Sequence, residues 1–300
     1  MIADAHCHFF SEAFFAALAR QRGRGESGEA VVRELGWDPP GAAESLADRW
    51  VRELDAHGVS RAALIASIPG DEASVAEAVA HHPTRFSGFF MADPSAADAV
   101  ERALRAVTEM GLRGICLFPA MHHVPLADDR TKRIIDIAAA HPGIVVFVHC
   151  GVLSVGVRRK LNLASRFDLR LGNPLDLHPV ALAFPHVPFI VPHFGAGLLR
   201  EALMLADTCP NVHLDTSSSN SWIRYTPGLT LDAVFRQAHA VAGAERLLFG
   251  TDSSFFPRGW QQGVYEEQRQ IAERLKMSAA DQALIFGGNF ERLFGEGGRG

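Results

Sequence analysis

Lysine is scarce in this 300-residue chain. Lys132, Lys160 and Lys276 are its only lysines, and the other 26 of its 29 basic residues are arginines. Acidic residues number 34, so the formal net charge is -5 at pH 7. Nucleic acids and anionic membrane surfaces bind proteins through a concentrated basic field, which this balance does not favour. We therefore expect a small-molecule ligand, with no nucleic-acid partner and no membrane partner.

Cysteine is also scarce, and long apolar runs are missing. The four cysteines are far apart in the chain and form no CxxC pair. This spacing argues against a thiolate zinc site and a dense disulfide framework, and it fits a reducing cytoplasm. No apolar run approaches the roughly 18 residues of a membrane span. The first apolar run begins at residue 2 and is polar by residue 8, too short for a signal peptide, so we expect a cytoplasmic protein.

Short apolar runs alternate with amphipathic stretches along the whole chain. Eight of these runs have the length and composition of strands, and a helical pattern follows each of them. The expected strands cover residues 2–8, 62–67, 86–91, 114–118, 144–149, 189–193, 212–216 and 247–251. The expected helices cover residues 44–57, 72–81, 96–110, 131–140, 175–183, 198–207, 231–241 and 261–275.

Eight strand-helix units in 300 residues match the size and order of an α/β protein with a (β/α)8 TIM barrel. A doubly wound open sheet is the alternative, but no GxGxxG fingerprint opens a helix after the first strand. The long connections after strands 1 and 5, residues 9–43 and 150–173, are typical of lids or binding loops. Neither a linker nor an internal repeat interrupts the pattern, so we expect a single domain over residues 1–300.

Four of the 14 histidines stand where expected strands end. His6 and His8 are two residues apart in the first strand, so both imidazoles project from the same face. His149, His193 and Asp252 close the fifth, sixth and eighth strand regions, and the carboxyl ends of barrel strands meet on one face. Several buried histidines and a carboxylate are costly without a shared partner. The pattern therefore predicts a site for one divalent metal ion.

Six segments carry a family resemblance that extends over nearly the whole chain. They are IADAHCH (2–8), VHCG (148–151), VPHFG (191–195), LDTS (214–217), LFGTDS (248–253) and GNFERLF (288–294). With these motifs the chain resembles the amidohydrolase superfamily, in the amidohydrolase-related (amidohydrolase 2) branch, and is similar to aminocarboxymuconate semialdehyde decarboxylase. Relatives in this branch are often homodimers, so a homodimer is a further expectation.

The resemblance implies roles for individual residues. It implies that His6, His8 and His149 ligate the metal, with Asp252 as a fourth ligand or near neighbour. It places His193 beside the metal-bound water or the substrate, as a group for proton transfer or charge stabilisation. Asp4 matches an acid that orients a ligand histidine. Zinc is the usual ion of the branch and suits nitrogen and oxygen ligands, while Mn2+ and Fe2+ are alternatives.

The scarcity of lysine bears on the number of metal ions. Two-metal amidohydrolases commonly bridge their ions with a carboxylated lysine at the end of the fourth strand, and the matching segment here, GICLFP (114–119), contains none. We therefore expect a mononuclear site. No lysine stands at any expected strand end, which also argues against Schiff-base chemistry. Relatives often have lysine and histidine where this chain has Cys116 and Phe118.

Candidate substrate contacts follow the strands on the same face. The connection after strand 5 is rich in arginine, whose guanidinium group binds carboxylates well. One of these arginines is expected to hold an acidic substrate, although each is also explained by solvation or by pairing with Asp168 or Asp176. Ser217 and His122 follow the seventh and fourth strands and are polar candidates, although both also suit ordinary loops. The candidate contacts are Arg158, Arg159, Arg166, Arg170, Ser217 and His122.

Three functional hypotheses fit these residues. The leading one is a single-metal hydrolase of an amide, lactone or similar small carbonyl compound, with Asp252 and His193 as catalytic groups. The alternative is a metal-dependent decarboxylase of a small, possibly aromatic, carboxylic acid, which a carboxylate-binding arginine would favour. A metal-binding protein without catalysis is the third, and the retained acid and histidine make it the least favoured.

Overall fold

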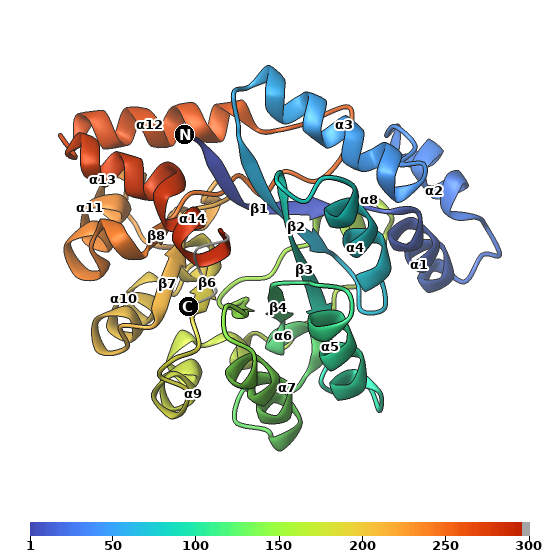
Figure 1. The fold of residues 1–300 in the computed structure, drawn as a ribbon, viewed down its shortest axis with the longest axis horizontal. Coiled ribbons are helices and arrows are strands. Elements are labelled where there is room, and N and C mark those ends of the chain that lie inside the picture. Colours follow the sequence, from blue (N-terminus) through green and yellow to red (C-terminus); the bar gives the residue numbers. More distant parts are fainter. Residues whose placement is uncertain (296–300) are drawn as a thin grey trace.

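The computed structural model describes residues 1–295 and contains an eight-stranded parallel sheet with the strand order β1 to β8 (Figure 1). The strands are β1 (Ala3–Phe9), β2 (Arg61–Ala66), β3 (Phe86–Ala92), β4 (Gly114–Leu117), β5 (Val145–Val148), β6 (Phe189–Val191), β7 (Val212–Asp215) and β8 (Leu247–Leu248).

The sheet closes between its first and last strands. The amide of Ala5 donates to the carbonyl of Phe249 at 2.8 Å, and Cys7 forms a parallel bridge with Ser253. These contacts extend the pairing of β8 beyond its two-residue core. The structure therefore confirms the (β/α)8 TIM barrel and rules out the open sheet.

Helices cover the outside of the barrel, each after its strand, as expected from the amphipathic stretches. They start and end within three residues of the ranges expected from the sequence, and a 3-10 turn at residues 174–177 replaces the start of the fifth expected helix. These helices are α3 (Ala43–Ala56), α4 (Glu72–His81), α5 (Ala99–Thr108), α7 (Asp129–Ala140), α9 (His178–Ala183), α10 (Leu199–Thr208), α11 (Leu231–Ala242) and α12 (Gln262–Arg274).

Side chains of the strands alternate between two cores. One core fills the space between strands and helices, and Phe90 belongs to it, whereas its neighbours Phe89 and Met91 point into the barrel. After α13 (Ala279–Ala283), helix α14 (Asn289–Phe294) adds Phe290 and Phe294 to the inner core. The inner core therefore supports the strand ends from below.

The long connections contain helices of their own. The segment after β1 forms α1 (Glu12–Arg22) and α2 (Gly28–Leu35), and the segment after β5 forms the short helix α8 (Gly156–Lys160). Another short helix, α6 (Pro119–His122), follows β4. A third apolar cluster, which includes residues of α1, α2 and α8, joins the two long connections.

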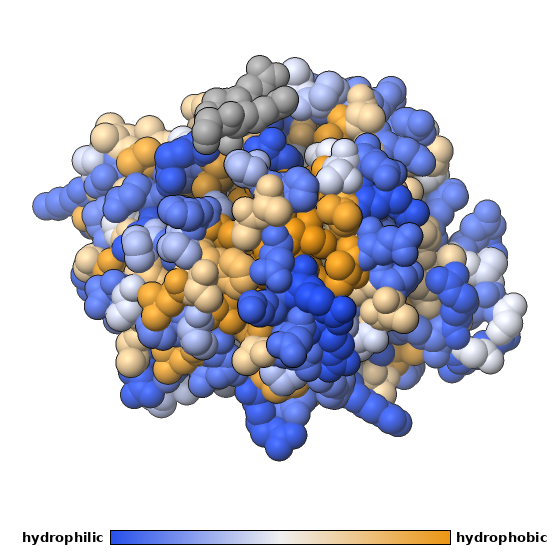
Figure 2. All heavy atoms as spheres, turned by 60° about the horizontal axis from the view of Figure 1, so that its bottom comes forward, coloured by the Kyte–Doolittle hydropathy of each residue, from blue (hydrophilic) through white to orange (hydrophobic). Residues whose placement is uncertain are grey.

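The outer surface is mixed in polarity. Figure 2 shows hydrophilic residues over much of one face, with hydrophobic residues gathered near its centre. Large exposed apolar side chains, such as Leu104, Leu182 and Met204, lie on different helices. No helix within residues 1–295 has both the length and the apolar character needed to cross a membrane. The homodimer stays a prediction.

Candidate metal centre and active site

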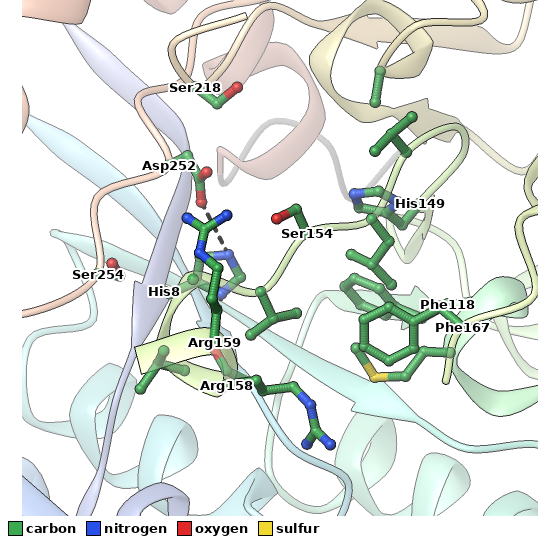
Figure 3. A pocket seen from close by; sticks show the side chains of 18 of the residues that line it. His8, Phe118, His149, Ser154, Arg158, Arg159, Phe167, Ser218, Asp252 and Ser254 are labelled. Atoms are coloured by element: carbon green, nitrogen blue, oxygen red, sulfur yellow. Dashed lines mark hydrogen bonds and ion pairs between the residues drawn. The ribbon is translucent and has the colours of Figure 1, made fainter. Parts of the chain in front are cut away.

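A cavity of about 970 Å³ lies at the carboxyl ends of the strands (Figure 3). Residues following β1 to β8, together with both long connections, contribute to its lining. All five of the predicted metal-binding and catalytic residues line it: His6, His8, His149, His193 and Asp252. The strand ends therefore bring together residues that are up to 246 positions apart in the chain.

His6, His8 and Asp252 form the tightest part of this site. The Nε2 atoms of the two histidines are 3.4 Å apart. Oδ1 of Asp252 lies 3.1 Å from Nε2 of His8 and 3.8 Å from Nε2 of His6. Zinc–nitrogen bonds are about 2.0–2.1 Å long, which puts neighbouring ligand atoms of a tetrahedral zinc site about 3.3 Å apart. The three side chains therefore have the spacing of a shared ion.

The hydrogen bonds of Nδ1 in both histidines leave Nε2 without a proton. Nδ1 of His6 lies 2.6 Å from Oδ2 of Asp215, which as a carboxylate only accepts. Nδ1 of His8 lies 2.7 Å from the hydroxyl of Ser67, and that hydroxyl donates to the carbonyl of Ile65. Both Nδ1 atoms are therefore donors, and both Nε2 atoms present lone pairs to each other and to Asp252. Three acceptors facing one another fit a cation.

The carboxylate of Asp252 stays ionised although it is partly buried, which suits a metal ligand. Burial raises the pKa of Asp252, but the neighbouring histidines outweigh it and hold that pKa well below its usual range. Burial lowers the pKa of His8. For His6, burial lowers the pKa, and the charge of Asp215 more than reverses this effect.

His149 lies apart from this group. Its ring stacks on Phe118, with centroids 5.4 Å apart, and stands edge-on to His193 at 5.5 Å. Figure 3 shows His149 beside Phe118, across the pocket from His8 and Asp252. In this cavity, the ligand atoms of His6, His8 and Asp252 all lie within 4.8 Å of one another, and His149 is not part of that group. Its role as a ligand stays a prediction.

His193 is held by the segment that follows β7. Its Nδ1 is 2.9 Å from the hydroxyl of Ser217, and its ring centroid is 5.0 Å from that of His6. Burial and the neighbouring charge of His6 lower the pKa of His193. The backbone at His193 has a positive φ of 55°. This uncommon conformation fits a side chain held at a functional position.

Asp215 was not singled out by its residue type in the sequence, although it belongs to the LDTS motif. It is fully buried, and besides bonding His6 it accepts from the amide of Ser217 at 2.5 Å. The sequence signal that could have revealed Asp215 was a carboxylate at the end of the seventh strand, on the face where three other strands end in histidines. Its contact with His6 joins positions 209 residues apart, so spacing did not reveal it.

Asp4 acts on the backbone. Its carboxylate accepts from the amides of His6 and Thr251 at 2.9 and 3.1 Å and from Nε1 of Trp260 at 2.7 Å. Burial raises the pKa of Asp4. It therefore ties the end of β1 to the segment after β8, while Asp215 holds the imidazole of His6.

Glycine is required where these strands meet. A Cβ on Gly250 would lie 2.9 Å from Cβ of both His6 and Ser217. The absence of a side chain at Gly250 therefore allows the segment after β8 to approach the ligand histidine.

The predicted substrate contacts divide into three groups. Arg158, Arg159, Arg166 and His122 line the cavity. Ser217 does not line it, because its side chain is buried between His6 and His193. Arg170 lies outside the cavity: its guanidinium bonds to Asp168 and its side chain is 89% exposed. The prediction that Arg170 faces the substrate does not match this position, because a carboxylate two residues away already binds it.

Further cations and aromatic rings line the cavity. Lys160, Arg224 and Arg258 line it and were not among the predicted substrate contacts. Trp37 and Phe255 stack with centroids 3.8 Å apart, Lys160 lies 5.4 Å from the Trp37 ring, and Arg258 lies 4.5 Å from the Phe255 ring. The wall formed by the connections after β1, β5 and β8 is therefore both aromatic and cationic.

Comparisons with solved structures agree with the barrel. The 5-carboxyvanillate decarboxylase LigW from Sphingomonas paucimobilis has a TM-score of 0.65 at 18% identity, over 98% of both chains. LigW2 from Novosphingobium aromaticivorans, with bound manganese, has a TM-score of 0.66 at 14% identity, over 98% of this chain and 97% of that one. A probable 2-pyrone-4,6-dicarboxylic acid hydrolase from Acinetobacter baumannii has a TM-score of 0.60 at 14% identity, over 98% and 99%. At these identities the likeness concerns the fold alone.

Comparisons of sequence identify the family. Protein fluG of Emericella nidulans is 32% identical over 93 residues, which are 30% of this chain and only 10% of that protein. The family model described as amidohydrolase matches residues 3–295. Because this match extends over nearly the whole chain, the protein belongs to the amidohydrolase family and is an enzyme of the amidohydrolase superfamily.

Proposed function

We propose that this protein is a mononuclear metal-dependent hydrolase of a small carbonyl compound, such as an amide or lactone, that also carries a carboxylate. The observation that carries the proposal is the set of three acceptor atoms, from His6, His8 and Asp252, at the inner end of the cavity. Two neutral imidazoles and one carboxylate leave positions for water and substrate, as catalytic metal sites require.

His6, His8 and Asp252 would hold the ion, with His149 as a candidate further ligand. A divalent ion bound there supplies Lewis acidity, which polarises a carbonyl group and makes water a stronger acid. Zn2+ is the first candidate because it favours this mixture of nitrogen and oxygen ligands. Mn2+ is the second, supported by the manganese in LigW2, and Fe2+ is the third.

The protein side chains then perform distinct tasks in the hydrolysis. The carboxylate of Asp252 accepts a proton from the attacking water and returns it to the leaving group. His193 stabilises the negative charge that develops on the carbonyl oxygen. Arginines of the connection after β5 hold a carboxylate of the substrate, since Arg159 and Arg166 line the cavity.

Decarboxylation is the second candidate, and the charge of the cavity favours it. Among residues 1–295, six cationic side chains line the cavity, against two carboxylates, Asp93 and Asp252, although the whole chain is acidic. The cationic residues are Arg158, Arg159, Lys160, Arg166, Arg224 and Arg258. In this reaction the carbon–carboxylate bond breaks, carbon dioxide leaves, and the electron pair left on carbon takes a proton from His193, or from Asp252 after that carboxylate has taken up a proton from water.

The two candidates differ in what happens to water. Metal-loaded protein is incubated with panels of lactones, amides and aromatic acids in 18O-labelled water, beside a chelated, metal-free sample. Hydrolysis predicts one labelled oxygen in the acid product, whereas carbon dioxide release without label in the organic product identifies decarboxylation. Full activity in the metal-free sample contradicts both candidates.

A further inference from the structure

The hydroxyl of Ser217 lies between the two histidines of the inner site. Its Oγ is 3.0 Å from Nδ1 of His6 and 2.9 Å from Nδ1 of His193. Ser217 has no exposed surface, so its hydroxyl proton needs a protein acceptor. Within residues 1–295, these two nitrogens are the hydrogen-bond partners of that hydroxyl.

Only one of the two nitrogens is free to accept. Nδ1 of His6 is 2.6 Å from the carboxylate of Asp215 and therefore carries the proton of that hydrogen bond. A ring nitrogen that bears a proton has no lone pair left for a second donor. The Ser217 hydroxyl therefore donates to Nδ1 of His193.

We propose that Ser217 selects the tautomer of His193. Because Nδ1 accepts from the hydroxyl, the ring proton of neutral His193 sits on Nε2, which leaves His193 as a hydrogen-bond donor towards the cavity. This inference rests on the proposed function for its use: a donor at this position stabilises a developing oxyanion or supplies a proton to carbon. Ser217 acts through His193 and is a positioning residue, without contact to the substrate.

A second group of Ser217, its backbone carbonyl, favours the other tautomer of His193. The backbone carbonyl of Ser217 lies 3.2 Å from Nδ1 of His193. A carbonyl only accepts, so it favours the proton on Nδ1, while the nearer hydroxyl favours the proton on Nε2. Removing the hydroxyl leaves the carbonyl as the partner of Nδ1. Ser217→Ala is therefore expected to move the ring proton from Nε2 to Nδ1.

Nitrogen NMR of the zinc-loaded protein with 15N-labelled histidine tests this tautomer without substrate. Protonated and unprotonated ring nitrogens have well-separated shifts, and His193→Gln identifies the signals of His193 by their loss. We expect an Nε2-protonated ring in the wild type and in Ser217→Thr, and an Nδ1-protonated ring in Ser217→Ala. Ser87→Ala, a buried serine on β3, is the matched control and leaves the tautomer unchanged.

Several outcomes overturn the proposal. An Nδ1-protonated His193 in the wild type, as ligation of the metal through Nε2 would require, contradicts it directly, as does a wild-type tautomer in Ser217→Ala. Once a substrate is found, Ser217→Ala lowers kcat about 100-fold with little change in KM, and Ser217→Thr restores it. Metal-loaded protein that catalyses neither hydrolysis nor decarboxylation contradicts the proposed function. The tautomer of His193 is measured without substrate, so that result decides the role of Ser217 separately.

Discussion

The two sides of the pocket are built differently. Around β1, β7 and β8, the side chains that hold His6 and its neighbours in place are buried, and their partners are on other strands: Asp215 binds His6, and Asp4 binds the amide of Thr251. On the side of the connection after β5, Arg159 and Arg166 are exposed to the cavity, and Arg170 bonds to a neighbour in sequence. The buried side fixes the geometry of the chemistry, and the exposed side supplies charge for binding.

The largest expected effect comes from the buried side. Asp252→Asn removes the carboxylate that accepts the proton and weakens the ligand set, so activity of the metal-loaded enzyme falls about 10³-fold or more. The fold is retained, because the amide of residue 252 still donates to the carbonyl of His6. Steady-state kinetics with thermal unfolding measures both effects. Asp93→Asn, at the other carboxylate of the cavity, is the control with a smaller loss; equal losses would remove the special role of Asp252.

Asp215→Asn tests the group that holds the ligand histidine. The amide is close in size but lacks the charge that fixes the proton on Nδ1 of His6. Metal affinity is therefore expected to fall about 10- to 100-fold, which is the usual effect of removing the hydrogen-bond partner of a ligand histidine. Competition with a chromophoric chelator measures the affinity. Asp168→Asn, at a carboxylate paired with Arg170 on the other side, leaves it unchanged; an unchanged affinity in Asp215→Asn contradicts the proposed support.

The same comparison explains what the sequence reveals. The strand runs and the positions of His6, His8 and Asp252 follow from local periodicity and from the rule that strand ends share a face, so the barrel and the three-residue cluster were predictable. The bond between His6 and Asp215 was not, because it depends on barrel closure across 209 positions. Periodicity gives the face on which a side chain lies but not its partner.

The exposed side was less predictable for another reason. Arg158, Arg159, Arg166 and Arg170 have the same residue type and lie in one connection, and only the path of that connection separates them. Three line the cavity, while Arg170 turns to Asp168. Lys160, which was not among the predicted substrate contacts, lines the cavity because α8 carries it to the ring of Trp37. The conformation of this connection therefore determines which of its basic residues line the cavity.

The burial of His213, below the active site, is expected to make the stability of the protein depend on pH. It lies on β7, is 4% exposed, and has a pKa lowered to about 3 by burial and by Arg292 and Arg246. An unfolded histidine titrates near 6.5, so between about pH 6.5 and 3 the unfolded state binds the extra proton and stability falls as pH falls.

His213→Leu should therefore lose stability less steeply on acidification. The wild type is expected to lose up to about 1.4 kcal/mol more per pH unit within that window, a tenfold change in the unfolding equilibrium. Urea unfolding at pH 7, 6 and 5 measures the slopes, and His186→Leu on the surface is the control. Identical slopes for His213→Leu and the wild type would show that His213 does not contribute.

The smallest effect is expected on the exposed side. Arg159→Gln removes one cation among several at the cavity, and an exposed charge pair contributes about 1 kcal/mol, so KM for a carboxylate substrate rises about fivefold while kcat is retained. Arg170→Gln, in the same connection but outside the cavity, leaves KM unchanged. An uncharged ester of the substrate distinguishes binding of the carboxylate from general disturbance, because its KM is the same in the wild type and Arg159→Gln. A large loss of kcat in Arg159→Gln would instead place this arginine with the buried groups, since a residue that only binds the substrate's remote charge stabilises ground state and transition state alike.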